Sequence, residues 1–116
     1  MGCGNIDALG DRSENFIGCG VYVKQVRMYP GWTVIQHAHK YDHLAIIPGE
    51  GRAVLTVDGH SQRLQGPCAV VIGAGKKHSV MALSSLLWQC VHRVDPNEKD
   101  AEKIDRELII NELPRV

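Results

Sequence analysis

The sequence predicts an all-β protein built as one antiparallel sandwich or barrel. Two observations support this fold class. Between residues 20 and 94, short runs rich in β-branched residues alternate with turn residues at close intervals, and no stretch there has helical periodicity. The 116 residues are also enough for one buried core and too few for two.

The expected strands are short apolar or alternating runs bounded by glycine, proline and serine. Asp58-Gly59 predicts a two-residue hairpin with a type I′ turn, because that turn needs positive φ at both central residues. We interpret Gly49–Gly51 as the tight turn of another hairpin, since no nucleotide-binding fingerprint surrounds it. The predicted strands are Val21–Met28, Thr33–His39, Leu44–Ile47, Arg52–Val57, Ser61–Leu64, Ala69–Ile72, His78–Leu83 and Leu86–Val94.

The two ends of the chain differ from this central part. The start is polar and rich in glycine, which predicts a flexible segment. After the last strand, Asp95 and Pro96 supply a helix cap and a first helical residue, and apolar residues follow at helical spacing. We therefore expect a helix from about Pro96 to Asn111, packed on the barrel or on a neighbouring subunit. The predicted divisions are a flexible segment over 1–16, a β-barrel over 17–94, and a helix with its tail over 95–116.

Charge and hydropathy reduce the range of expected functions and partners. Thirteen basic residues balance thirteen acidic ones, so the chain lacks the basic surplus that nucleic acids and anionic membranes select. No apolar run approaches the roughly 20 residues that span a bilayer, and the start does not resemble a secretion signal. We expect a cytoplasmic protein that acts on a small molecule, without nucleic acid or membrane as a partner.

Three of the six histidines lie in one seven-residue stretch, HAHKYDH. Residues two apart on a strand share a face, so His37 and His39 project together, and a tight turn can return His43 to the same space. Crowded neutral imidazoles each need a hydrogen-bond partner, and protonation would bring like charges together. A divalent metal removes that conflict, so the cluster predicts a metal site, whereas one histidine alone would be an ordinary core or surface residue.

A fourth nitrogen ligand would come from one of the other three histidines. His60 directly follows the Asp-Gly turn, which favours a solvated side chain. His92 shares a strand face with Trp88 and Cys90. His78 opens a strand after a glycine-rich turn, so its ring can meet the first three across a barrel, and it is the preferred fourth ligand.

The segment around these histidines resembles the first motif of the cupin family. In that motif a glycine is followed by a His-x-His pair and then by a glutamate. Gly31, His37 and His39 match the first three positions, and His43 stands where the family has its glutamate. A second cupin motif is similar to the segment with Gly66, Gly75 and His78, although Gly73 and Ala82 replace its proline and asparagine.

The resemblance implies a small single-domain cupin, an antiparallel β-barrel or jelly roll with a C-terminal helix. Carried over by position, the metal ligands are His37, His39, His43 and His78. They would bind one divalent transition metal, which could be Fe, Mn, Zn, Ni, Co or Cu because imidazole suits all of them. With histidine in place of glutamate, the bound metal would keep nearly its full charge and favour an anionic ligand. Small cupins also pair, which implies a homodimer.

All-histidine cupin sites imply a dioxygenase-like oxidoreductase that acts on a small anionic, oxygen-rich substrate of enolate, diketone or catechol type. Two alternatives stay open. One is a zinc-dependent cyclase or isomerase, and the other is a cupin that binds a metal or a small ligand without catalysis. Turnover that depends on the metal would separate an enzyme from a binding module.

Several polar residues are candidates for lining the pocket. Tyr41 and Asp42 lie in the loop between the ligands, where Asp42 could either orient an imidazole or be solvated. Four more residues would line the barrel if their strand faces turn inward and would otherwise be ordinary outward polar residues. These four are Gln25, Arg27, Gln89 and His92.

Overall fold

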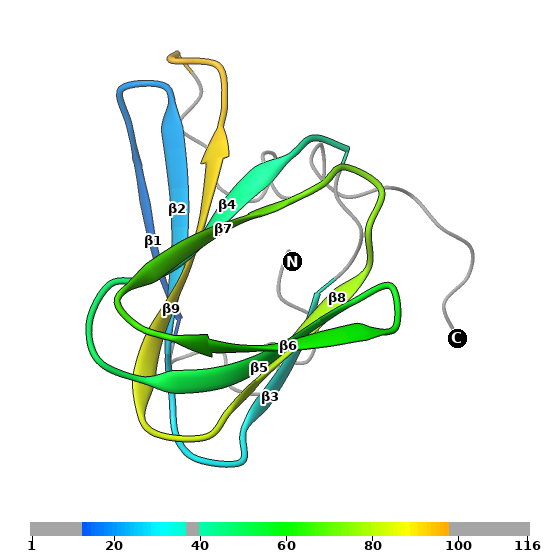
Figure 1. The fold of residues 1–116 in the computed structure, drawn as a ribbon. Coiled ribbons are helices and arrows are strands. Elements are labelled where there is room, and N and C mark those ends of the chain that lie inside the picture. Colours follow the sequence, from blue (N-terminus) through cyan, green and yellow to red (C-terminus); the bar gives the residue numbers. More distant parts are fainter. Residues whose placement is uncertain (1–12, 37–39, 98–116) are drawn as a thin grey trace.

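The computed structural model describes residues 13–36 and 40–97, and it folds these ranges into nine strands with no helix among them (Figure 1). Every strand pair is antiparallel. The strands are β1 (Ser13–Gly18), β2 (Val21–Met28), β3 (Thr33–Gln36), β4 (His43–Ile47), β5 (Arg52–Val57), β6 (His60–Gln65), β7 (Cys68–Ile72), β8 (His78–Ala82) and β9 (Leu86–Arg93).

The strands form two sheets that face each other as two layers (Figure 1). One sheet has five strands in the order β1-β2-β9-β4-β7, and the other has four in the order β3-β8-β5-β6. The chain passes repeatedly from one sheet to the other, as in a jelly roll. The predicted all-β class and jelly-roll architecture are therefore confirmed.

The core lies between the two sheets because side chains alternate along each strand. In β2 and β9 every second residue is buried, and the residues between them are half-buried or exposed. Buried apolar residues from both sheets form one cluster, which joins the layers. Its members are Val26, Met28, Val34, Ala45, Ile47, Ala53, Leu55, Leu64, Ile72, Val80, Ala82, Leu86, Trp88 and Cys90.

The predicted strands agree with the observed ones to within one residue at each end, except that the end of Thr33–His39 lies outside the described ranges. The Asp58-Gly59 turn is also confirmed. Val57 pairs with His60, and the two residues between them have positive φ, 49° at Asp58 and 83° at Gly59. These are the backbone angles of a type I′ turn.

Strand β1 was missing from the prediction, and it begins at Ser13, inside the segment expected to be flexible. Its sequence is mostly polar because it is an edge strand that pairs with β2 alone. The hairpin that joins the two has Cys19 and Gly20 as its central residues, both at positive φ. A two-residue loop ending in glycine was the signal for this hairpin, but a cysteine in its first position concealed it.

The prediction of a hairpin at Gly49–Gly51 was wrong. β4 pairs with β7 and β9, whereas β5 pairs with β6 and β8, so this turn carries the chain between the sheets. Gly66 packs against it: its N–H donates to the Gly51 carbonyl at 2.8 Å, and a Cβ there would collide with the Gly49 carbonyl oxygen and with Ile47. Glycines that permit a close crossing produce the same sequence pattern as those of a tight hairpin.

The predicted C-terminal helix lies almost wholly outside the described residues, as does most of the segment over 1–16. The residues expected to cap it are described. The Asp95 Oδ1 atom accepts a hydrogen bond from the Asn97 N–H at 2.9 Å, which is the bond that an N-cap aspartate makes. The helix and the domain boundaries stay predictions.

Candidate metal centre

Two histidines lie next to each other on the inward face of the five-stranded sheet. His43 begins β4 and His92 is near the end of β9, and both are buried, with about 5% of each residue exposed. Their rings are stacked, with centroids 4.6 Å apart and planes 27° apart. A stacked neighbour restricts rotation of the ring, so His92 helps to fix the orientation of His43.

His78 approaches the same point from the opposite sheet. It begins β8, it is 4% exposed, and its ring centroid is 5.4 Å from that of His43. His43 and His78 are 35 residues apart along the chain and belong to different layers, so the jelly roll itself brings them together. His60, the less favoured candidate for the fourth ligand, is exposed at the start of β6.

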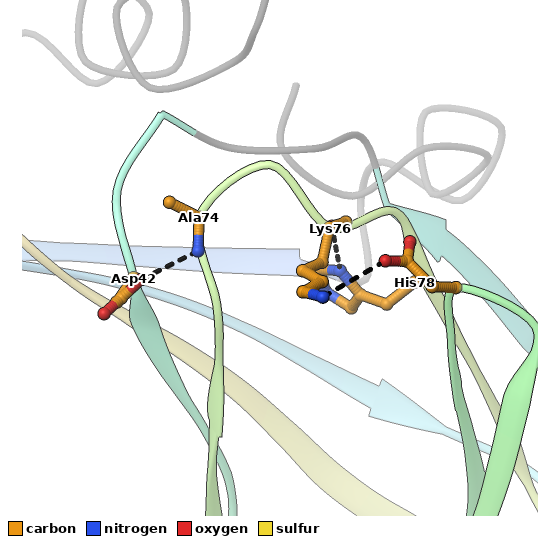
Figure 2. A network of polar contacts seen from close by, with 5 residues as sticks. Asp42, Ala74, Lys76 and His78 are labelled. Carbon is orange, nitrogen blue, oxygen red and sulfur yellow. Dashed lines mark hydrogen bonds and ion pairs between the residues drawn. The ribbon is translucent and has the colours of Figure 1, made fainter.

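The backbone orients the His78 ring. Its Nδ1 lies 3.4 Å from the carbonyl oxygen of Lys76, which makes Nδ1 the donor and leaves the imidazole lone pair on Nε2 (Figure 2). Burial lowers the pKa of His78 below its ordinary value of 6.5, against a smaller opposite effect of the Lys76 carbonyl. His78 is therefore neutral at pH 7, which is the form that binds metal ions.

Asp42 connects the two loops that precede these histidines. Its Oδ1 accepts a hydrogen bond of 2.7 Å from the backbone N–H of Ala74 (Figure 2). Asp42 directly precedes His43, and Ala74 lies in the turn that leads to His78, so one bond holds both approaches in place. Asp42 was a candidate partner for a ligand imidazole, but its described hydrogen bond is to the backbone of Ala74.

An open surface pocket at this end of the barrel includes His43 and His92 but not His78, and it extends over the outward residues Leu44, Val71 and Val91. Three of the residues predicted to line a pocket are on its wall, namely Tyr41, Asp42 and His92. His43 lines it as well, together with residues of the β1–β2 turn and of the chain after β9. Tyr41 is 62% exposed.

The other three predicted pocket residues lie on the outward face of the sheet. Gln25 and Arg27 alternate with the buried residues of β2, and Gln89 alternates with those of β9. The Gln89 side-chain amide donates to the Gln25 carbonyl oxygen at 2.6 Å, and the Gln25 amide in turn donates to Glu14 at 3.1 Å. These glutamines tie β1, β2 and β9 together on the side away from the histidines.

His37 and His39 lie outside the described residues, so their role as ligands stays a prediction. The last residue of β3, Gln36, pairs with His78 in the sheet. The chain therefore reaches residue 36 beside the first residue of β8. In the described ranges, no group of three or more histidine, cysteine or acidic side chains is arranged to hold an ion.

The chemistry of the described pair fits a shared metal. Imidazole nitrogen suits the divalent transition metals. A metal–nitrogen bond is about 2.1 Å long, so two imidazoles on one ion have ring centroids no more than roughly 6.5 Å apart. The 5.4 Å between His43 and His78 meets this condition. The site as predicted needs His37 and His39 for its other two positions.

Lys24 was not recognised as part of this region. It is 4% exposed, and it alternates with Gln25 so that it shares the inward face of β2 with Tyr22 and Val26. Its Nζ lies 3.4 Å from the Tyr22 hydroxyl oxygen. The alternation in Val21–Met28 was the signal, because it places a lysine in a row of residues that is otherwise buried.

These features define a cupin-type jelly roll with histidines gathered at one end, and solved structures confirm the cupin fold. A cupin superfamily protein from Desulfitobacterium hafniense is similar, with a TM-score of 0.62 and 20% identity over 72% of this chain and 76% of that one. A cupin 2 domain-containing protein from Halorhodospira halophila has a TM-score of 0.61 and 19% identity over 83% and 74%. KdgF from Halomonas sp. has a TM-score of 0.60 and 16% identity over 74% and 80%.

Such low identities establish the fold alone. No family model matches the sequence, and no curated protein matches it.

Across the described ranges there is no helix of the length and apolar character that crossing a bilayer requires.

Proposed function

We propose that this chain is a metal-dependent cupin enzyme, with a dioxygenase-like reaction on a small anionic, oxygen-rich substrate of enolate, diketone or catechol type. The proposed ligands are His37, His39, His43 and His78. The observation that supports it best is the convergence of buried His43 and His78 from opposite sheets, with ring centroids 5.4 Å apart. A bound divalent ion would supply a Lewis acid for two substrate oxygens and, if it is redox active, a centre for dioxygen.

The residues of the chain would contribute orientation and exclusion of water. The Lys76 carbonyl and the stacked His92 ring fix the planes of His78 and His43. The bond from Ala74 to Asp42 holds the two loops that carry these histidines. Burial keeps His78 neutral, so that no proton has to leave before a metal binds. A prearranged set of ligands of this kind lowers the cost of assembling the site.

The reaction class can be tested by oxygen uptake. In a dioxygenase reaction the substrate is itself the reductant: one C–C bond breaks and both oxygen atoms enter the products. Protein loaded with iron(II) is mixed with 2,4-pentanedione, catechol or 3,4-dihydroxybenzoate in an oxygen electrode, and the products are identified by mass spectrometry. We expect one O₂ consumed per substrate, lost in His78→Ala and retained in His60→Ala, since His60 is exposed.

The alternatives give different results in the same assay. Conversion by the zinc-loaded protein without oxygen would favour a cyclase or isomerase. Binding without product for every metal would contradict the enzyme proposal and favour a binding module. Oxygen uptake that is equal in His78→Ala would contradict the proposed site.

We also propose that the chain forms a homodimer. Leu44 and Val71 are apolar and exposed on the outer face of β4 and β7, with exposed fractions of 40% and 66%. β7 is an edge strand of its sheet, and unpaired edges favour association. Light scattering coupled to size exclusion should give a dimer for the wild type and a monomer for Val71→Asp. Ile35→Asp, at a 55% exposed residue of the other sheet, is the matched control and should stay dimeric.

A further inference from the structure

The outer face of the five-stranded sheet has a row of apolar residues that crosses every strand. The pairing register places one residue from each strand in this row, and residues directly opposite each other share a face of the sheet. In the strand order β1-β2-β9-β4-β7, the members of this apolar row are Phe16, Val23, Val91, Leu44 and Val71. Three of them are exposed, namely Phe16 at 52%, Leu44 at 40% and Val71 at 66%.

A neighbouring row on the same face has a different composition. Its members from β1, β2 and β9 are Glu14, Gln25 and Gln89, which are joined by side-chain hydrogen bonds. A sheet face that meets water normally has polar residues such as these. The members from β4 and β7 are Ile46 and Ala69, which are apolar. Within these two rows, the apolar surface is therefore concentrated on β4 and β7, and an exposed patch of this kind indicates a contact surface.

The described chain ends beside this part of the apolar row. After β9, the Val94 N–H donates to the Gly20 carbonyl at 2.9 Å, which holds the chain against the β1–β2 turn. Asp95 and Pro96 then line the surface pocket that also includes the β9, β4 and β7 members of the row. The β1 and β2 members are not part of that pocket. The segment that follows Asn97 therefore starts next to the β9, β4 and β7 members.

The sequence after Asn97 has apolar residues whose spacing matches these three strands. Ala101, Ile104 and Leu108 recur at helical spacing, and in a helix that rises about 1.5 Å per residue the first and last of them are roughly 10 Å apart. Adjacent strands are about 4.8 Å apart, so the β9 and β7 members of the apolar row are also roughly 10 Å apart. One helix that crosses the strands would therefore place one apolar side chain over each of the three.

We propose that the segment 98–111 docks as an amphipathic helix on the apolar row of its own chain, over Val91, Leu44 and Val71. Because the segment continues directly from the wall of the pocket, docking within one chain closes only a short loop and costs little entropy. The homodimer proposed on the same face would then form against this helix as well as against the sheet, so Val71→Asp would disturb both contacts. Docking requires no bound metal and stands apart from the proposed reaction.

Hydrogen exchange of the full chain, followed by mass spectrometry, tests the docking. We expect peptides over 98–111 to exchange at least about tenfold more slowly in the wild type than in Val71→Asp, because a helix of this length is marginal on its own in water. Ile104→Asp, which changes the segment and leaves the sheet intact, should give the same loss of protection. Phe16→Asp is the matched control. It changes an exposed apolar residue of the same row outside the pocket, and it should leave the segment protected.

Two further results would overturn the proposal. One is exchange over 98–111 that is equally fast in the wild type and in the Val71→Asp and Ile104→Asp variants, since the segment would then have no partner on the sheet. The other is protection that disappears on dilution as dimers dissociate, because a second copy would then cover the row. Protection that persists in dilute, monomeric wild type and in Phe16→Asp supports docking within one chain, whether or not the protein holds a metal.

Discussion

The two ends of the barrel are built on the same strands and differ completely in chemistry. At one end, the inward residues of β2 and β9 are Met28 and Leu86, beside Trp88, and all belong to the apolar cluster. At the other end, the same two strands place Tyr22, Lys24 and His92 inside. The comparison indicates that stability comes mainly from the apolar end, which leaves the polar end available for a site.

The largest expected effect is at the apolar end. Trp88 is 1% exposed and among the largest fully buried side chains, so Trp88→Ala should lower the free energy of unfolding by about 3–5 kcal/mol. Trp88→Phe should lower the free energy of unfolding much less, because the indole Nε1 has no hydrogen-bond partner among the described residues. Urea unfolding followed by circular dichroism measures both, with Val71→Ala as an exposed control. A loss below about 1 kcal/mol in Trp88→Ala would contradict this division of roles.

A smaller effect is expected where the chain crosses between the sheets. Gly66→Ala should cost about 1–3 kcal/mol, because the added Cβ would collide with the Gly49 carbonyl oxygen and Ile47. Gly49→Ala is the matched control, since a Cβ there meets nothing within 4 Å. Thermal unfolding of the two variants should separate them clearly. Equal stability would show that the crossing can relax, and the explanation of Gly66 would fail.

The smallest effect is the pH dependence that His78 gives to the polar end. Its pKa is lowered in the folded state, so below about pH 6.5 the unfolded chain binds the proton first and the folded state loses stability as pH falls. In chelator-treated protein, the free energy of unfolding of His78→Gln should therefore fall less steeply than that of the wild type as the pH decreases below about 6.5. Urea unfolding at each pH gives the slope. Identical slopes would contradict the burial argument.

Most of the fold was predictable because its signals are local. The Asp58-Gly59 turn and the alternation in Val21–Met28 each depend on a few adjacent residues, and the strands they imply are present. β1 was missed because an edge strand that is paired on one side needs little apolar sequence. The Gly49–Gly51 turn was misread because a sheet crossing and a hairpin require the same backbone freedom.

The site was predictable to a lesser degree, because it depends on contacts between distant residues. The sequence identified His43 and His78, and the structure brings them together from two sheets. The sequence did not show that His92 stacks on His43 or that Asp42 accepts a hydrogen bond from Ala74. Both contacts depend on how β4, β9 and the loops meet in space. Gln25, Arg27 and Gln89 could line the pocket only if their side chains turned inward. Their positions on β2 and β9 place them on the outward face of the sheet.

The most direct test of the central claim is the metal content of untagged protein, measured by elemental analysis. The account predicts about one transition-metal ion per chain in the wild type and in His60→Ala, whose histidine is exposed at the start of β6. His43→Ala and His78→Ala should each fall by about tenfold or more while keeping their β-sheet circular dichroism. Undiminished metal in both variants would contradict the claim that the two sheets meet to form a metal centre.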